Sequence, residues 1–160
     1  MDTVRLVALI LATISSGLIA GLFYGYHVAM VTSLRAVDDR TYVTVNQKVN
    51  IHILNGGFFL PYLGSAVLSA VSAALLLGGD RGSVLLPTIL AFVFNVAAIL
   101  VTGGGNIPLN NMIDRSNLDQ ATQTREKFEK PWNRFNALRS WLHTLGFGAM
   151  CWALVAFGAL

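Results

Sequence analysis

The sequence predicts an all-α protein: a four-helix transmembrane bundle that forms one domain over residues 1–160. Of the 160 residues, 54% are hydrophobic and only 12% are charged, whereas a soluble domain carries about 25% charged residues. Four apolar segments are each long enough to cross a bilayer, which takes about 20 helical residues. These segments also lack the alternation of apolar and polar residues that a membrane β-barrel requires.

The four spans are expected at about residues 4–29, 57–77, 83–102 and 138–160. The first is longer than the apolar core of a signal peptide, which has about 7–15 residues, so we interpret it as a transmembrane helix. The second and third spans are joined by GGDRG at 78–82, which predicts a tight turn. The other two connections are long. We expect a short extra helix around Asn46 and Asn50 in the first long loop, and an ordered third loop.

Basic residues concentrate on the side of the long loops. That side carries Arg35, Arg40, Lys48, Arg115, Arg125, Lys127, Lys130, Arg134 and Arg139, against Arg5 and Arg81 on the other side. Because loops rich in Lys and Arg stay in the cytoplasm, we expect cytoplasmic long loops and insertion in a bacterial plasma membrane. The net charge of +3 is then a property of membrane loops, and we expect no nucleic-acid partner.

Small residues recur at helical spacing in the first two spans. Such ridges let helices approach closely, either within the bundle or in a homo-oligomer. The ridges comprise Gly17, Gly21 and Gly25 in the first span and Ser65, Ser69 and Ser72 in the second. The single cysteine, Cys151, lies in an apolar run, where we expect a small buried side chain and no internal disulfide.

Polar side chains gather at the end of the bundle that carries the long loops. Trp132, Asn136, Arg139 and His143 are spaced by four, three and four residues, which places them on one helical face. Asn95, Thr102, Asn106 and Asn110 form a second row, and Ala20, Tyr24 and His27 form a third. Polar groups are costly in lipid unless they face the bundle interior. We therefore expect the three rows to converge on a pocket.

The third span ends in TGGGNIPLNN, residues 102–111. Three consecutive glycines and Pro108 are expected to break the helix and release backbone carbonyls. A broken helix at membrane depth is tolerated only where protein buries it or where it lines a cavity. The sequence therefore predicts a pocket wall at the point where the third helix ends.

Three stretches of the chain resemble signature segments of the anthrone-oxygenase-like family of small four-helix membrane proteins. They are DDRTYVTVNQKVNIHILNGGF, VTGGGNIPLNN and PWNRFNALRSWL. The positions that match the family pattern are Asn50, Asn55, Thr102, Asn106, Pro108, Asn110, Trp132, Asn136 and Arg139. The sequence departs from the pattern at Gly56, where the family often has proline, and its three histidines lie outside the pattern.

The resemblance implies a membrane-embedded oxygenase that converts an anthrone- or polyketide-like aromatic compound with O2. Such chemistry requires a base, a partner for the developing oxyanion and an apolar aromatic pocket, but no cofactor. Histidine is the natural base near neutral pH, and we choose His143 because it lies one turn from Arg139. We expect Arg139, Asn106, Asn110 and Asn136 to hold the oxyanion. Substrate contacts are expected from Trp132, Tyr24, His27, Asn50, Asn55, Phe58, Phe59, Tyr62 and Thr102.

Two other functions fit the sequence. The first is a membrane oxidoreductase in which His27, His52 and His143 bind copper, iron, zinc or haem, since each histidine comes from a different segment. The second is a non-enzymatic membrane transport or scaffold protein, which explains the helices but not the row from Trp132 to His143. A transporter would more often place acidic residues within its spans, whereas here they lie in the loops and near the N-terminus.

Overall fold

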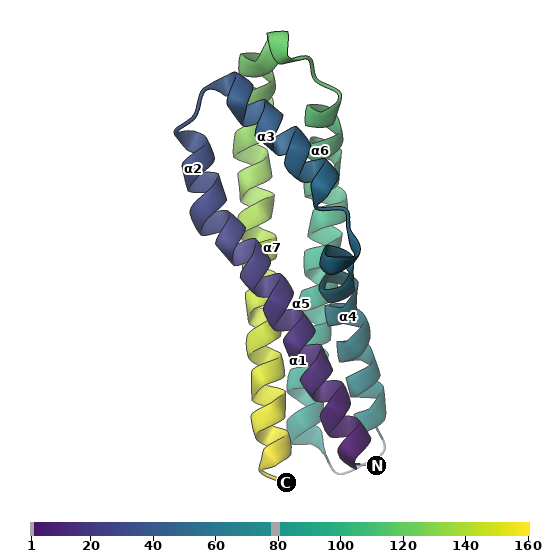
Figure 1. Ribbon diagram of the computed structural model, residues 1–160. Coiled ribbons are helices and arrows are strands. Elements are labelled where there is room, and N and C mark those ends of the chain that lie inside the picture. The colour runs from purple at the N-terminus through teal and green to yellow at the C-terminus, as the bar shows by residue number, and fades with distance from the viewer. Residues whose placement is uncertain (1, 78–80) are drawn as a thin grey trace.

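The computed structural model describes residues 2–77 and 81–160, which are helical apart from short connections. Four helical runs are long and apolar enough to cross a membrane: Asp2–Arg35, Gly56–Leu76, Gly82–Asp114 and Leu118–Gly158. They form an elongated bundle, and both ends of the chain lie at its lower end (Figure 1). The predicted helical bundle with four candidate spans is confirmed. Residues 78–80 of the predicted tight turn lie outside the described residues.

The first run is one continuous helix with a change of winding. It consists of α1 (Asp2–Gly25), the π-helical segment η1 (Tyr26–Met30) and α2 (Val31–Arg35). The helix predicted in the first long loop is α3 (Asp39–His52), which packs against the third and fourth runs. It begins at a side-chain cap, because the Thr41 hydroxyl and N–H both donate to Asp38. These hydrogen bonds hold the pKa of the Asp38 carboxyl below its usual value.

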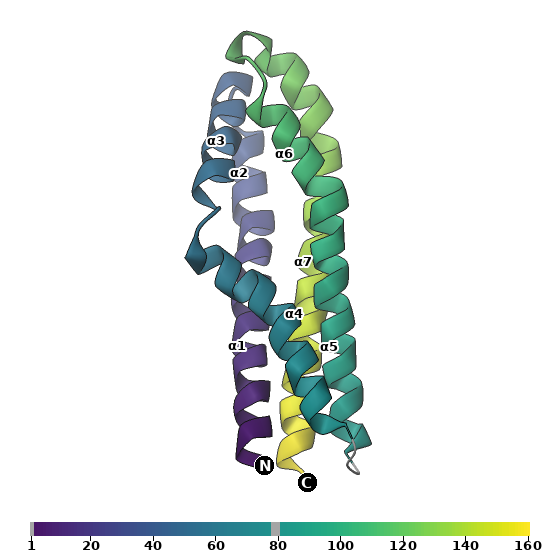
Figure 2. The ribbon, with the colours of Figure 1, turned by 90° about the vertical axis from the view of Figure 1, so that its right-hand side faces the viewer.

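The third run corrects one prediction from the sequence. After α4 (Gly56–Leu76), the chain continues through α5 (Gly82–Val101), the π-helical segment η2 (Thr102–Asn106) and α6 (Ile107–Asp114). The three glycines therefore widen the helix instead of breaking it. Pro108 lies in the first turn of α6, directly after the π-helical segment. Figure 2 shows the ribbon running from α5 into α6 without a break, beyond the end of α4, with α6 tilted toward the side of α3.

The fourth run is also longer than predicted. A short 3-10 turn, η3 (Leu118–Gln120), leads into α7 (Ala121–Gly158), a helix of 38 residues that includes Pro131. The predicted fourth span was confined to the apolar residues 138–160. Its N-terminal extension is charged, yet it packs through Phe128 and Trp132 onto Tyr42, Val43 and other core residues.

Three apolar clusters of buried residues lie in the described part of the bundle. One lies between the candidate spans and includes Leu9, Leu76, Val84 and Met150. A small one joins α1 to α4 through Ile19, Phe23 and Tyr62. A further one surrounds Phe128 and joins α2, α3, α6 and the N-terminal half of α7. We call the end of the bundle built from these four segments the polar end. It is a folded extension of the bundle, and the ordered third loop expected from the sequence belongs to it.

The predicted small-residue ridges are confirmed only in part. Ser65, Ser69 and Ser72 are buried between helices. A Cβ atom added to Gly17 would lie 3.0 Å from the ring of Phe147, so the helices approach closely there. Gly21 and Gly25 have nothing within 4 Å of that position, which leaves oligomer contacts through the ridge as a prediction. Cys151 is a free thiol and is half-buried instead of buried.

We predict that Gly105→Ala destabilises the protein and that Gly104→Ala does not. A Cβ at Gly105 would lie 2.5 Å from Cγ of Phe135 on α7, whereas at Gly104 it would meet nothing within 4 Å. Crowding of this kind costs about 1–3 kcal/mol, and alanine in an open helical position is neutral or stabilising. Thermal unfolding in detergent micelles measures the difference. Equal midpoints for the two variants would contradict the close packing of η2 on α7.

Candidate functional site

A cavity of about 200 Å³ lies at the junction between the membrane spans and the polar end. Segments from every run contribute to its wall, together with α3. The lining side chains are largely aromatic and aliphatic: Leu22, Phe23, Tyr26, Val49, Asn50, Ile53, Leu54, Phe58, Phe59, Tyr62, Thr102, Ile107, Asn110, Trp132 and Arg139. An apolar cavity with a few convergent polar groups is the usual form of a small-molecule site.

Arg139 is the only side chain in this wall with a full charge. It is 7% exposed, and its Nε and one terminal nitrogen donate to Oδ1 of Asn136 at 3.1 and 2.9 Å. Within residues 2–77 and 81–160, no carboxylate lies within 4.0 Å of it. A buried cation without an anionic partner is strongly unfavourable in an apolar environment. The cavity is therefore suited to an anion.

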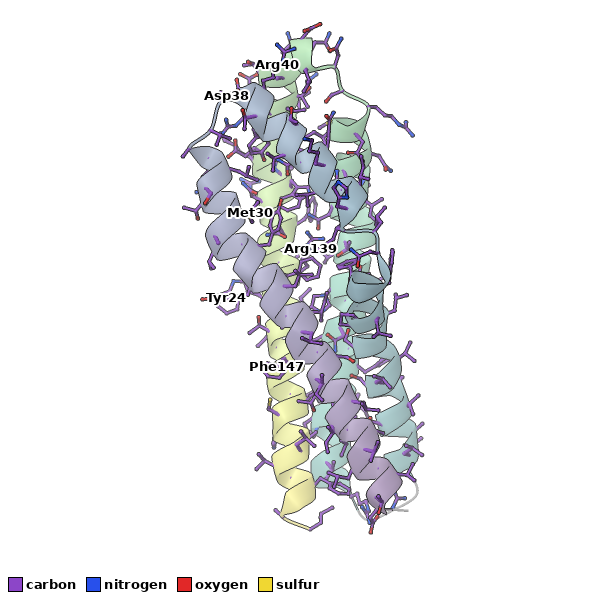
Figure 3. All side chains as sticks on the ribbon, viewed as in Figure 1. Tyr24, Met30, Asp38, Arg40, Arg139 and Phe147 are labelled. Atoms are coloured by element: carbon purple, nitrogen blue, oxygen red, sulfur yellow. The ribbon has the colours of Figure 1, made fainter. Side chains whose placement is uncertain are left out.

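Aromatic rings surround the guanidinium. Its central carbon lies 4.1 Å from the ring centroid of Phe23 and 5.3 Å from that of Trp132. Figure 3 shows Arg139 pointing into the space between the helices, below α3. Phe58 and Tyr62 stack on each other with centroids 4.9 Å apart. Phe23 and Trp132 partly offset the buried charge by cation–π attraction. Phe58 and Tyr62 add flat apolar surfaces for a planar ligand.

Both π-helical segments border the cavity. η1 supplies Tyr26, whose hydroxyl is buried without a hydrogen-bond partner, and η2 supplies Thr102. A π-helical turn changes the direction in which the following side chains project, and such turns are frequent at functional sites. Their presence on two helices at the same level supports this cavity as the functional site.

His143 lies directly behind the wall. It is fully buried, its ring stacks on Phe23 with centroids 5.3 Å apart, and it meets Tyr62 edge-on. Its Nδ1 is 3.0 Å from Oδ1 of Asn95, whose amide nitrogen is directed to Oγ of Ser16 and to a backbone carbonyl. With the amide in that orientation Nδ1 is the donor, and in a neutral imidazole Nε2 is then the acceptor nitrogen. Nε2 is buried and has no partner.

The three asparagines predicted to hold an oxyanion have different environments. Asn110 lines the cavity and accepts a 2.7 Å hydrogen bond from the indole of Trp132. Asn136, one turn before Arg139 on α7, accepts hydrogen bonds from its guanidinium, and the Asn106 amide donates to the backbone carbonyl of Trp132 at 3.4 Å. Asn106 Oδ1 and Asn136 Nδ2 are buried without partners. The structure thus places Asn106 and Asn136 behind the wall, with Arg139 and Asn110 in it.

Of the predicted substrate contacts, Trp132, Asn50, Phe58, Phe59, Tyr62 and Thr102 line the cavity. Tyr24 does not: its side chain is 56% exposed and points away from the bundle in Figure 3. The buried face of the first run passes through Ile19 and Phe23, and η1 then brings Tyr26 to the cavity. His27 lines a different groove. The structure thus places neither His27 nor Tyr24 in the wall of this cavity.

Asn55 also lies outside the wall. Its side chain accepts a hydrogen bond from the Phe58 N–H at 3.1 Å and donates to the His52 carbonyl at 2.7 Å. It therefore caps the N-terminus of α4, a position where asparagine is among the preferred residues. Its predicted role in binding substrate is replaced by a role in ending one helix and starting the next.

The three histidines proposed as metal ligands do not come together. His52 is exposed on α3, His27 lies in an outer groove, and His143 is buried beneath the cavity. In the part of the chain that the structure describes, no group of three or more His, Cys, Asp and Glu side chains is arranged to hold a metal ion. The described structure therefore does not bring the three histidines into one shared site.

Several wall residues were missed in the sequence. Phe23 and Tyr26 lie on the cavity side of the first run, next to the face of Tyr24 and His27 that the sequence predicts. Val49 on α3 and Ile53 at its C-terminal end are spaced by four residues and so share one helical face. The sequence contains this apolar pair, but it is interrupted by the polar residues Asn50 and His52. Leu22, Leu54 and Ile107 carry no polar signal, and an exposed apolar residue in or beside a predicted span cannot be told from a lipid contact in the sequence.

A family model described as anthrone oxygenase matches residues 58–149, more than half of the chain. The matched range includes Tyr62, Thr102, Asn110, Trp132 and Arg139, which all line the cavity. No curated protein and no solved structure matches the sequence.

We predict that Asn55→Ala lowers the free energy of unfolding by about 1 kcal/mol and that Asn55→Asp lowers it less. Aspartate still accepts the capping hydrogen bond from Phe58 but cannot donate to the His52 carbonyl, whereas alanine loses both hydrogen bonds. Thermal unfolding in detergent measures the effect. Neither variant should change the affinity for a ligand of the cavity beyond what the loss of stability explains. A large loss of affinity in the well-folded aspartate variant would instead restore Asn55 as a binding residue.

Proposed function

This chain belongs to the anthrone oxygenase family, and we propose that it is a membrane-embedded oxygenase that works without a cofactor. Its substrate is a hydrophobic aromatic compound, anthrone- or polyketide-like, and its oxidant is O2. The observation that carries the proposal is the unpaired guanidinium of Arg139 in an aromatic wall. Such a site suits a planar compound that gains negative charge on an oxygen during the reaction.

The reaction begins with proton removal from the CH2 group opposite the carbonyl of the anthrone. The electrons move to the carbonyl oxygen, and the resulting enolate is stabilised by Arg139, with Asn110 in the same wall. The electron-rich carbon transfers an electron to O2, and the two radicals combine to form a peroxide at that carbon. Loss of the second C–H proton with cleavage of the O–O bond gives a quinone. One anthrone and one O2 yield one quinone and one water.

We assign the proton acceptor to His143. Its Nδ1 donates to Asn95, so the imidazole is held as the tautomer whose Nε2 can accept a proton. Phe23 and Tyr62 contact both the imidazole and the cavity. A change of side-chain rotamer at either ring opens a path from the substrate to Nε2. Asn95 is the positioning residue in this scheme, because it acts through His143.

The substrate reaches the cavity from the bilayer. Leu22, Leu54 and Phe59 line the cavity and are also 42%, 64% and 41% exposed, so they form an apolar rim at the outer surface. Both O2 and a polycyclic substrate partition into hydrocarbon, where this rim meets them. Entry through the bilayer keeps bulk water away from the enolate and strengthens its attraction to Arg139.

The proposal is tested by replacing Arg139 with glutamine. We expect Arg139→Gln to lower turnover of a hydroxyanthrone by about 100- to 1,000-fold, the usual effect of removing one oxyanion donor. The control is Arg115→Gln at an exposed position of the polar end. O2 consumption and quinone absorbance in proteoliposomes provide the two readouts. Turnover that survives in the Arg139 variant would remove this side chain from the mechanism.

A second prediction separates proton removal from binding. His143→Gln should reduce turnover by about 100-fold or more, because it removes the base. Binding of the quinone product should stay within a factor of a few, since His143 does not line the cavity. His52→Gln, at an exposed position on α3, is the matched control. If the His143 and His52 variants turn over alike, another group removes the proton.

A further inference from the structure

A second groove lies on the outside of the bundle, between the η1–α2 segment and α7. It encloses about 500 Å³ and is lined by His27, Arg35, Glu129, Lys130, Asn133 and Arg134, with Ala137 at its lower edge. None of these residues lines the aromatic cavity. The groove is thus a separate feature, and the oxygenase proposal makes no use of it.

The groove carries an excess of positive charge. Arg35, Lys130 and Arg134 contribute three cations, and Glu129 contributes one carboxylate. That carboxylate is already bound by Arg125 at 2.8 Å, with Arg35 at 3.9 Å. Among the described residues, Lys130 and Arg134 have no carboxylate within 4.0 Å. The groove therefore offers two unneutralised cations to an anion.

Hydrogen-bond donors accompany the cations. Nδ1 of His27 is buried and has no partner in the described structure. Asn133 lies on the same wall and adds an amide. An imidazole, an amide and two or three cationic side chains around one space form a suitable environment for a phosphate group, whose oxygens accept several charge-assisted hydrogen bonds.

The groove lies at the level where lipid headgroups are expected. His27 follows directly on the apolar run of α1, and Arg134 precedes the apolar part of α7 by one turn. Below the groove, the surface becomes apolar and aromatic. Trp141, one turn beyond Ala137, is 65% exposed, and Tyr24, one turn before His27, is 56% exposed. Trp and Tyr are enriched at this depth of a membrane, where a polar surface meets hydrocarbon.

We propose that this groove binds the phosphate headgroup of an anionic phospholipid, with the acyl chains lying over Tyr24 and Trp141. Basic pockets between membrane helices bind anionic headgroups in this manner. A free phosphate ion shares the headgroup chemistry but would gain nothing from the apolar surface below the groove. The proposal rests on the four spans crossing a membrane and is independent of the oxygenase activity.

The test uses the full chain, purified in mild detergent and mixed with phosphatidylglycerol or phosphatidylcholine before native mass spectrometry. We expect retention of one phosphatidylglycerol molecule in preference to phosphatidylcholine. The double variant Lys130→Gln/Arg134→Gln should retain at least about five times less of it. The control is Lys48→Gln/Lys127→Gln, which removes the same charge from exposed positions outside the groove and should retain as much as the unmodified protein.

Three results would overturn the proposal. Equal retention of the two lipids would show that the groove does not select an anionic headgroup, and an equal loss in both double variants would show attraction to overall charge only. Displacement of phosphatidylglycerol by millimolar inorganic phosphate would assign the groove to the free ion. Turnover of a hydroxyanthrone is measured in the same samples, so that failure of lipid binding and failure of the oxygenase proposal are distinguished.

Discussion

The guanidinium of Arg139 is the group on which the arrangement of this site depends. Asn136 holds it from the same helix, and the rings of Phe23 and Trp132 flank it. A charge buried in this way is destabilising unless its surroundings compensate it. Behind the wall, the neighbouring amides of Asn106 and Asn136 carry buried atoms without partners among the described residues. An anionic aromatic compound in the cavity would compensate the charge of Arg139, because its oxygen would meet the guanidinium and its rings the aromatic wall.

The polar end of the bundle makes this burial possible. Without α3, the face of α7 that carries Trp132 and Arg139 would open to water, and the charge would be solvated. Gln47 on α3 donates to the backbone of Ile113 at 2.8 Å and so ties the first long connection to the end of α6. The two π-helical segments then direct Tyr26 and Thr102 toward the enclosed space. The residues outside the spans thus exclude water from a site that the spans alone could not enclose.

Helical spacing was enough to predict the fold and the face from Trp132 to His143, because four buried residues in steps of three and four determine a helix direction. Helical spacing did not identify which face of the first run is buried. The face through Tyr24 and the face through Phe23 are equally regular, and no nearby residue distinguishes them. The predicted helix break at residues 103–105 was wrong for a different reason. Glycine permits a π-helical turn as readily as a break, and the local sequence does not show that Gly105 packs closely on Phe135 of α7. Asn55 and His143 both lie at the height of the cavity along the bundle, yet Asn55 caps a helix and His143 lies behind the wall. Contacts between segments that are distant in the sequence determine these placements.

The account is tested most directly by comparing how a planar aromatic anion and a neutral compound of the same shape bind. A hydroxyanthraquinone, ionised or methylated at its hydroxyl, provides such a pair, and quenching of tryptophan fluorescence reports occupancy because Trp132 lines the cavity. We expect the unmodified protein to bind the anion at least about ten times more tightly, a difference of about 1.4 kcal/mol, and Arg139→Met to lose that preference while remaining folded. Equal affinity for the two compounds in the unmodified protein would contradict the claim that an unpaired Arg139 selects the ligand.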